Sequence, residues 1–386
     1  MSDAALDAVF CRETFWRDPI RVSTNVVAEL FVARGWRCTW LTAPVTLTRR
    51  WWRPGPHRRR LAMWRAGGRT TPERVFEYAP AVPLTWSWRP GLRSPWLGRN
   101  ALRMACPPLP RVLARHRMAT RPRVLWIGSL PMASAVTAIP AERTAYHAHD
   151  LFMDYPGAPP QLRMLERWLI ERVDAVFATS AEIREALVAR YGTPERKVHL
   201  LGHGVHLARY APAPEPAELV PFKRPRAIVV GTLDEIDAPL TRHLLDHRPD
   251  LELICIGPGG AALRSLGPRV HVLGPRPNEE IAPYLLHADV GLILYPLGRD
   301  RDRRAGCNPM KLYEYAAAGL PVVTTWLPGY AATGAPVLAG RTRAELADAL
   351  DCALDAPAPQ RERMRAFAAQ HGWDAKYDFI CERLGL

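Results

Sequence analysis

A lysine and a glutamate three residues apart, Lys311 and Glu314, are the residues of this sequence best suited to ligand chemistry. They lie in the stretch CNPMKLYEYAAAGLPVVTT at 307–325, where Asn308 is expected to cap a helix whose first residue is Pro309. Lys311 then falls in the first turn, where backbone N–H groups already attract anions. Glu314 shares its face and could accept hydrogen bonds from sugar hydroxyls. The pair suits a phosphate-bearing ligand with a ribose, with a solvated ion pair as the structural alternative.

A second group of reactive residues follows the strand expected in TAYHAHDLFMDY at 144–155. That strand should end near His147, which places His149 and Asp150 at the carboxyl edge of a sheet, where ligands of open α/β sheets bind. Asp150 is the candidate general base for an acceptor hydroxyl. His149 is the rival base, and a capping turn at Asp150 is the structural alternative.

Two other loops carry candidate contacts. The loop between the first expected strand and helix, at 11–23, contains Arg12, Glu13 and Arg17, which could bind an acceptor or simply be solvated. Further along, His203 stands between two glycines that allow a close backbone approach to a ligand. We therefore expect acceptor contacts from the first loop and a contribution of His203 to ligand binding.

Alternation of short apolar strands with helices along the whole chain predicts an α/β protein. We expect two Rossmann-like, doubly wound parallel-sheet domains facing across a cleft. The N-terminal domain would span 1–208 and the C-terminal domain 209–370, with a helix at about 371–386 packing back on the first. The proline-rich run at 210–225 would be the linker.

Composition is that of a globular protein, with 48% hydrophobic and 23% charged residues, and its seven scattered cysteines favour a reducing compartment. No signal peptide or membrane-spanning apolar run is expected. The net charge of +14 is concentrated at the start, because residues 1–130 carry 23 arginines, no lysine and 7 acidic residues. Ten of the 13 tryptophans lie there too. The N-terminal third therefore has a chemistry of its own.

Arginine interleaved with tryptophan suits an anionic membrane surface, since indole rings lie at headgroup level and guanidinium groups bind phosphate. Nucleic acid and a merely solvated basic face are the alternatives. The region 49–123 is broken by prolines and glycines, with short amphipathic helices expected within it. The residues we expect to face the membrane are Trp51, Trp52, Arg58, Arg59, Arg60, Trp64 and Trp96.

Metal and cofactor motifs are weak in this sequence. Asp300 and Asp302 match a DxD pattern that can bind a metal, but their flanking arginines favour coincidence. GPGG at 257–260 is an incomplete dinucleotide fingerprint, and the cysteines lack zinc spacing. We expect no metal and no bound cofactor.

Taken in order, these motifs resemble the GT-B glycosyltransferases, most closely the GumK-type, xanthan glucuronosyltransferase-like enzymes. The quoted matches run from about residue 120 to the end and comprise YHAHD, GHGV, VGTLDEID, MKL and GWDAKYDFI. The resemblance implies Asp150 as general base, Lys311 on the donor diphosphate, and Glu314, Tyr295 and Leu233 around the nucleoside. It brings Gly231, Met310 and His203 into the donor site as well.

The resemblance also implies a function. It is transfer of a sugar, with glucuronic acid as a candidate, from a UDP-sugar or another nucleotide-diphosphate sugar to a lipid-linked saccharide. The enzyme, of EC class 2.4, would be inverting, metal-independent and peripheral on the cytoplasmic face of the plasma membrane, in exopolysaccharide or cell-surface glycan synthesis, without nucleic acid. Glu314 replaces a glutamine of that subgroup and is instead like the retaining family-4 enzymes. A retaining family-4-like transferase is therefore one alternative, and a basic nucleic-acid or membrane-binding protein on a degenerate transferase scaffold is the other.

Overall fold

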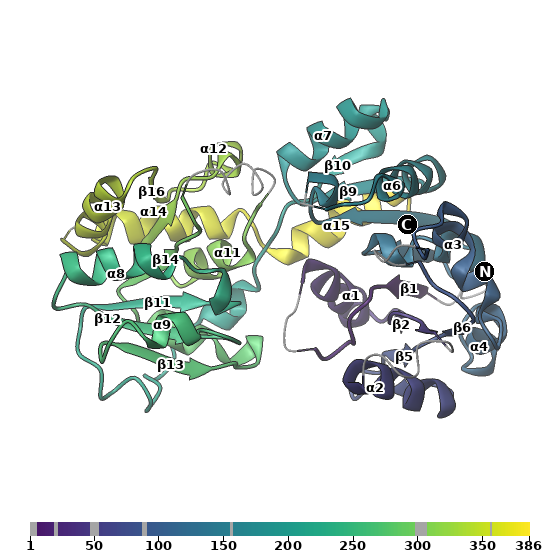
Figure 1. The fold of residues 1–386 in the computed structure, drawn as a ribbon, viewed down its shortest axis with the longest axis horizontal. Helices are drawn as coiled ribbons and strands as arrows, with labels where there is room; N and C mark the ends of the chain where they lie inside the picture. The colour runs from purple at the N-terminus through teal and green to yellow at the C-terminus, as the bar shows by residue number, and fades with distance from the viewer. Residues whose placement is uncertain are drawn as a thin grey trace. The chain divides into compact units, whose positions relative to one another are not determined.

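The protein consists of two compact units. The computed structural model describes residues 6–18, 22–46, 54–86, 91–154, 157–297, 307–355 and 357–386. Residues Met1–Gly202 and Tyr377–Leu386 form the first unit, and residues His203–Lys376 form the second (Figure 1). Each unit is built around its own sheet and is described separately.

The first unit contains an eight-stranded sheet in the order β10-β9-β8-β7-β1-β2-β5-β4. All neighbouring strands are parallel except β4, which pairs with β5 in the antiparallel sense, and β3 and β6 form a separate parallel pair. The strands are β1 Asp7–Cys11, β2 Arg37–Leu41, β3 Val45–Thr46, β4 Arg69–Thr70, β5 Phe76–Tyr78, β6 Ala81–Val82, β7 Val124–Ile127, β8 Arg143–Ala148, β9 Ala175–Ala178 and β10 Val198–Leu200.

Helices cover both faces of this sheet, because alternate strand residues point to opposite sides. One face packs an aliphatic core against α3, α4, α6 and α7, and the other packs aromatic rings such as Phe10 and Phe177 against α1 and α15. The helices are α1 Ser23–Ala33, α2 Pro54–Arg65, α3 Pro95–Asn100, α4 Leu109–Arg115, α5 Ala135–Ala138, α6 Pro160–Arg172, α7 Ala181–Tyr191 and α15 Trp373–Leu384.

The second unit contains a six-stranded, wholly parallel sheet in the order β13-β12-β11-β14-β15-β16. Its strands are β11 Arg226–Val230, β12 Glu252–Ile256, β13 Val270–Gly274, β14 Val290–Ile293, β15 Val322–Thr325 and β16 Leu338–Gly340. Its helices are α8 Ala238–His247, α9 Ala261–Arg264, α10 Ala282–Leu286, α11 Met310–Ala317, α12 Pro328–Thr333, α13 Arg343–Asp355 and α14 Pro357–Ala369.

Two apolar cores lie on opposite faces of the second sheet, as expected for buried parallel strands. Ile228 and Ile254 belong to the core shared with α10, α11 and α14, whereas their neighbours Val229 and Cys255 belong to the core shared with α8, α9 and α13. This alternation fixes the register of each strand, because a one-residue slip would exchange the two cores. It also fixes the position of α11, which carries Lys311.

The fold class predicted from the sequence is confirmed as two doubly wound α/β sheets. Counted within each unit, the second sheet has the strand order 3-2-1-4-5-6, and the first follows the same order with one further parallel strand and an antiparallel edge strand. In such sheets the order reverses between the first and fourth strands, and ligands bind beyond the carboxyl ends there. The reversal points are β1/β7 and β11/β14.

Two local features were not predicted from the sequence. The arginine-rich stretch around residues 54–65 forms the regular helix α2, because its prolines, Pro54 and Pro56, lie in the first turn, where a missing N–H costs little. The proline-rich run 210–225 is not an extended linker but part of the second unit. Leu219 is buried there, and Arg226 forms an ion pair with Glu215.

The side chain of Tyr315 links α11 to the second sheet and should be needed for stability. The buried Val230 N–H donates to the Tyr315 hydroxyl at 2.9 Å. Replacing Tyr315 with Phe leaves that N–H without its acceptor, so we expect the free energy of unfolding to fall by about 1–3 kcal/mol. Urea denaturation measures the change. Tyr284→Phe is the control, since its hydroxyl donates to the half-exposed Glu218, which water can solvate. An equal loss in both variants would contradict this role of Tyr315.

Candidate functional site

The reversal point of the second sheet brings Lys311 against the backbone of Gly231. Gly231 directly follows β11 and has φ +111°, and a Cβ at this position would lie 3.2 Å from Lys311 Nζ. A Cβ on Gly257, the residue after β12, would lie 1.8 Å from the Gly231 carbonyl oxygen. Only glycines allow these approaches. The ammonium group of Lys311 is therefore held directly over the carboxyl edge of the sheet.

Helix α11 begins at this edge. The structure corrects the expected cap: Pro309, with φ −73° and ψ 125°, is the N-cap residue, and Met310 is the first residue of the helix. Asn308 does not cap the helix, because its Oδ1 accepts a hydrogen bond from the Tyr313 hydroxyl at 3.1 Å. Among the described residues no side chain caps the helix start, so the positive end of its dipole and the Lys311 ammonium act on the same region.

Tyr295 supplies an aromatic wall beside Lys311. Its ring centroid lies 5.7 Å from Lys311 Nζ, and its backbone N–H donates to Thr325 Oγ1 at 3.1 Å. Tyr295 follows β14 and is almost fully buried, so its ring is fixed by the fold. The structure thus brings together Gly231, Lys311 and Tyr295, which the sequence singled out from separate segments.

Glu314 belongs to a polar chain that the sequence did not predict. Asn278 Nδ2 donates to Glu314 Oε1 at 2.7 Å, and Arg209 Nη1 donates to Asn278 Oδ1 at 2.9 Å. Burial raises the pKa of Glu314, although the Asn278 hydrogen bond and the charges of Lys311 and Arg209 act in the opposite direction. Arg209 and Asn278 lie in two short 3-10 helices, Leu207–Tyr210 and Asn278–Glu280, that are far apart in the sequence, and no motif marks either residue.

Leu233 packs against the glycine loop at 257–260. Its N–H donates to the Pro258 carbonyl at 3.0 Å, and a Cβ on Gly260 would lie 2.8 Å from its Cδ1. The carboxylate of Asp234 accepts the Gly260 N–H at 2.9 Å. The Gly260 N–H is therefore already hydrogen-bonded to a carboxylate. The role of the glycine loop is to support the side chain of Leu233.

His203 lies in a buried position among the aromatic rings beneath α11. Its ring is 6.2 Å from that of Tyr313, and its Nδ1 has no hydrogen-bond partner among the described residues. Burial, together with the charge of Lys376, lowers the pKa of His203 to about 3. Burial also lowers the pKa of Lys376 to about 8. His203 is therefore neutral at physiological pH.

The reversal point of the first sheet holds the candidate catalytic residues. His149 follows β8, and its Nε2 lies 2.7 Å from Thr24 Oγ1 and its Nδ1 3.1 Å from Ser23 Oγ. These hydroxyls belong to the start of α1, which approaches β7 closely, since a Cβ on Gly128 would lie 2.6 Å from Thr24 Oγ1. The imidazole is thus fixed by α1, and the half-buried Asp150 follows it in the loop.

The loop after β1 carries the expected acceptor contacts. Arg12 donates to the Gly128 carbonyl, which ties the ends of β1 and β7 together. Arg12 Nε, Glu13 Oε2 and Ser129 Oγ are buried polar atoms that have no hydrogen-bond partner within the described part of the chain. Buried polar atoms are usually satisfied, so these atoms mark a place where a polar ligand could bind.

Other residues of this loop are engaged in structure. Arg17, expected to contact the acceptor, instead forms an ion pair with Glu73. Arg60 Nη2 donates to the Glu13 carbonyl at 2.8 Å, and the guanidinium of Arg59 lies 4.0 Å from the centroid of the Phe15 ring. Arg59 and Arg60, expected at a membrane surface, therefore also hold the loop in place.

The remaining residues expected at a membrane differ in exposure. Trp51 and Trp52 lie outside the described residues. Trp96 is 58% exposed and Arg58 is exposed, whereas Trp64 is half-buried and its indole N–H donates to the Cys106 carbonyl at 2.8 Å. Among the described residues, no helix is long and apolar enough to cross a membrane.

The described residues form no site of the kind that a metal ion needs. Asp300 and Asp302, the two acids of the DxD pattern, lie outside the described residues. Within the described ranges, no three His, Cys, Asp or Glu side chains are grouped so that they could hold a metal ion.

Relatives of known structure share this architecture. Sucrose-phosphate synthase from Thermosynechococcus elongatus has a TM-score of 0.66 at 17% identity, covering 97% of this chain and 98% of that chain. HepE from Anabaena, in complex with UDP-glucose, has a TM-score of 0.61 at 15% identity, covering 98% and 99%. At these identities the likeness shows the fold alone, which is the GT-B fold.

Sequence comparisons point to the same group. TuaH of Bacillus subtilis (strain 168), a teichuronic acid biosynthesis glycosyltransferase, is 24% identical over 177 residues, which is 43% of this chain and 44% of TuaH. The match thus spans less than half of that relative. The family model Glycosyltransferase Family 4 matches residues 23–209, and Glycosyl transferases group 1 matches residues 228–356. Since these two matches extend over most of both units, the chain belongs to the family 4 and group 1 glycosyltransferases of the GT-B fold.

Proposed function

We propose that the protein transfers a sugar from a UDP-sugar to a lipid-linked saccharide, and that its second unit binds the donor. The observation that carries this proposal is the position of Lys311, whose ammonium lies over Gly231 at the uncapped start of α11. The positive charges of Lys311 and of the start of α11 together complement the negative charge of a diphosphate. The HepE structure was determined with UDP-glucose, which supports a uridine nucleotide as the donor carrier.

Glu314 and Tyr295 would recognise the nucleoside. Asn278 engages Oε1 of Glu314, which leaves the second carboxylate oxygen to accept the hydroxyls of a ribose. The fixed ring of Tyr295 and the side chain of Leu233 provide apolar surface nearby. His203 and Met310 complete the proposed donor site, with the neutral imidazole supporting the helix rather than carrying charge.

Catalysis by this site would rest on stabilising the leaving group. When the bond between sugar and phosphate breaks, negative charge develops on the departing diphosphate. Lys311 and the amides at the start of α11 are already oriented towards that charge, so they need not reorganise during the reaction. No further group is needed to explain why the leaving diphosphate would be stabilised at this position.

The acceptor would bind at the β1/β7 edge of the first unit. Arg12, Glu13 and Ser129 provide buried polar atoms without partners among the described residues, and His149 is held in a fixed orientation by Ser23 and Thr24. A saccharide offers many hydroxyls that could satisfy such atoms. Arg17 contributes less, because Glu73 already neutralises its charge.

The acceptor class and the location are inferred from chemistry and from the relatives. TuaH is described as a teichuronic acid biosynthesis enzyme, which supports a role in cell-surface glycan synthesis. The basic first unit, with the exposed Trp96 and Arg58, supports peripheral binding at the anionic cytoplasmic face of the membrane. A GumK-type specificity for glucuronic acid is the finer hypothesis, and the donor panel below includes that sugar.

The stereochemical outcome depends on Asp150. An inverting enzyme would use it as general base, whereas a family-4-like enzyme would retain the anomeric configuration without such a base. The family 4 match and the presence of glutamate rather than glutamine at position 314 both favour the retaining alternative over the inverting mechanism expected from the GumK-type resemblance.

Donor binding is the first prediction from the proposed function. In thermal unfolding with UDP, GDP, TDP and their sugars, including UDP-glucuronic acid, we expect one nucleotide to stabilise the protein, by roughly 2.7 kcal/mol at a hundred times Kd. Lys311→Ala should abolish that shift because it removes the charge over Gly231. Lys223→Ala, at an exposed position of the same unit, is the matched control. No shift with any nucleotide would favour the non-enzymatic alternative, and an unchanged shift in Lys311→Ala would disprove the proposed site.

The second prediction concerns Asp150. We expect NMR of the product to show the anomeric configuration of the donor, and Asp150→Asn to lose less than tenfold in kcat. A general base contributes about 10²- to 10⁴-fold, so the inverting mechanism requires a loss of that size together with an inverted product. The UDP-induced thermal shift of the variant is the control, because it should remain that of the wild type under either mechanism.

The third prediction follows from the raised pKa of Glu314. The proton is bound more tightly in the folded state than in the unfolded state, so ionisation of Glu314 lowers stability as pH rises through the folded pKa. Glu314→Gln keeps an oxygen for Asn278 but cannot ionise. We expect wild type and variant to be equally stable below the ordinary glutamate pKa, and the variant to become the more stable one at neutral pH. Denaturant titrations over this pH range would refute the interpretation if the difference were independent of pH.

A further inference from the structure

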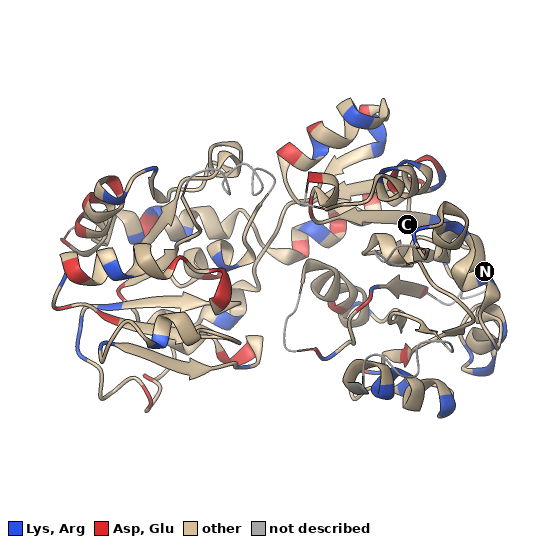
Figure 2. Ribbon diagram, viewed as in Figure 1, with Lys and Arg blue, Asp and Glu red and all other residues tan. Residues whose placement is uncertain are grey.

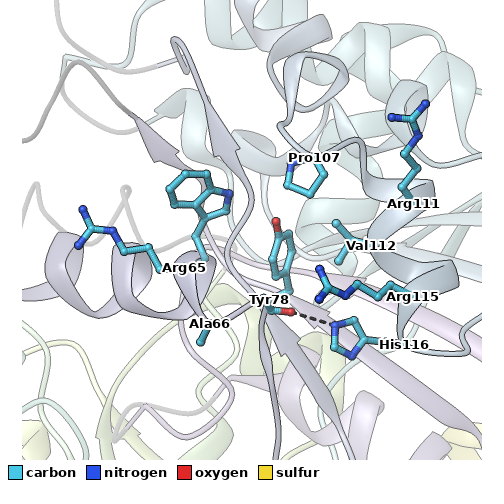
Figure 3. A pocket seen from close by; sticks show the side chains of 10 residues that line it. Arg65, Ala66, Tyr78, Pro107, Arg111, Val112, Arg115 and His116 are labelled. Atoms are coloured by element: carbon cyan, nitrogen blue, oxygen red, sulfur yellow. Dashed lines mark hydrogen bonds between the residues drawn. The ribbon is translucent and has the colours of Figure 1, made fainter.

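A pocket in the first unit lies apart from the residues proposed for transfer. It has a volume of about 530 Å³ and is formed by the end of α2, strand β5 and helix α4 (Figure 3). Its lining includes Trp64, Arg65, Tyr78, Arg111, Arg115 and His116. Arg115 extends toward Tyr78, while Arg65 and Arg111 project at opposite sides of the pocket (Figure 3). The volume is that of a small-molecule or headgroup site.

The positive charge of this pocket is not neutralised by any described residue. The side chains of Arg65, Arg111 and Arg115 make no hydrogen bond or ion pair with any other described residue. Residues 54–86 and 91–123 contain fourteen arginines, and their only acidic residues are Glu73 and Glu77. Both acids are already engaged, Glu73 by Arg17 and Glu77 by Arg69. Helices α2 and α4 accordingly appear blue without red in Figure 2.

The walls between the arginines are rigid and partly aromatic. The ring of His116 is stacked on that of Phe76 at 3.9 Å, and its Nε2 is 2.9 Å from the Gly67 carbonyl. Trp64 is fixed by its hydrogen bond to the Cys106 carbonyl, and Tyr78 is 1% exposed. The arginines therefore project from a preformed frame, so the ordering cost of binding an anion falls on their own side chains and not on the pocket walls.

We propose that this pocket binds the phosphate group of a membrane lipid and so docks the first unit on an anionic bilayer. Guanidinium groups pair with phosphate oxygens in a bidentate manner, and the aromatic wall suits the boundary between headgroup and acyl chain. The inference deepens the proposed function and rests on its membrane location. It adds a defined phosphate site to what would otherwise be general attraction between a basic surface and an acidic membrane.

A lipid fits this pocket better than a nucleic acid does. A single concave pocket of headgroup size offers one phosphate site, whereas nucleic-acid binding proteins present a groove that follows a backbone over several phosphates. The exposed Trp96 on α3 belongs to the same arginine-rich region and provides a side chain that can enter the interface.

Vesicle binding tests the proposal. Sedimentation with phosphatidylcholine vesicles, with and without phosphatidylglycerol, should show binding that needs the anionic lipid. Each of Arg111→Gln and Arg115→Gln, and the double variant, should weaken it. The matched control is Arg103→Gln with Arg121→Gln, which removes the same charge at exposed positions that do not line the pocket. We expect the pocket double variant to lose about tenfold more affinity for the vesicles than the control pair. If only diffuse charge acted, each basic residue near the surface would contribute a similar amount to vesicle binding, and the two losses would be equal.

The other outcomes overturn the proposal. Equal losses in the pocket and control variants would mean that only diffuse charge acts. Stabilisation by inorganic pyrophosphate through Arg111 and Arg115, without vesicle binding, would make the pocket a site for free phosphate. Binding of a single-stranded oligonucleotide but not of vesicles would assign the surface to nucleic acid. The UDP-induced thermal shift of the same variants separates failure of docking from failure of the proposed donor site, since it should be unchanged.

Discussion

The proposed donor site depends on one steric constraint, the absence of a side chain at Gly231. A Cβ on Gly231 would lie only 3.2 Å from Lys311 Nζ, and a Cβ on Gly257 would lie 1.8 Å from the Gly231 carbonyl oxygen. These contacts are possible only because β11, β12 and β14 are adjacent at the point where the strand order reverses. The strand order thus creates the carboxyl edge of the sheet, the glycines leave room there for the Lys311 side chain, and the lysine supplies a positive charge.

Burial then sets the charge states around that edge. Glu314 is shifted toward its neutral form and His203 is neutral, while Lys311 remains beside the positive end of α11. A low local dielectric strengthens the attraction between a positive group and an anion, which is why burial matters for the proposed site. The polar chain from Arg209 through Asn278 to Glu314 holds that carboxyl group in place, so this part of the proposed site is preformed.

The sequence predicted the features that depend on local pattern. The motif at 307–325 indicated the helix, its lysine and the following strand, and the repeated apolar strands indicated two parallel sheets. It could not predict the partnership of Asn278 and Arg209 with Glu314, because that depends on how distant loops meet. It also misplaced the cap of α11, because the side chain of Asn308 forms a hydrogen bond with Tyr313 in place of a helix N–H.

Composition likewise predicted the positive charge of the first unit, but not which of its arginines remain available to a ligand. Some arginines neutralise buried acids, as Arg37 does for Asp7 and Arg69 for Glu77, and these are part of the fold. Others, such as Arg111 and Arg115, have no acidic partner among the described residues and line a preformed pocket. Counting charges cannot separate the two groups, since it ignores where the carboxylates are. The excess that remains after pairing is what a ligand can experience, and it is concentrated around α2 and α4.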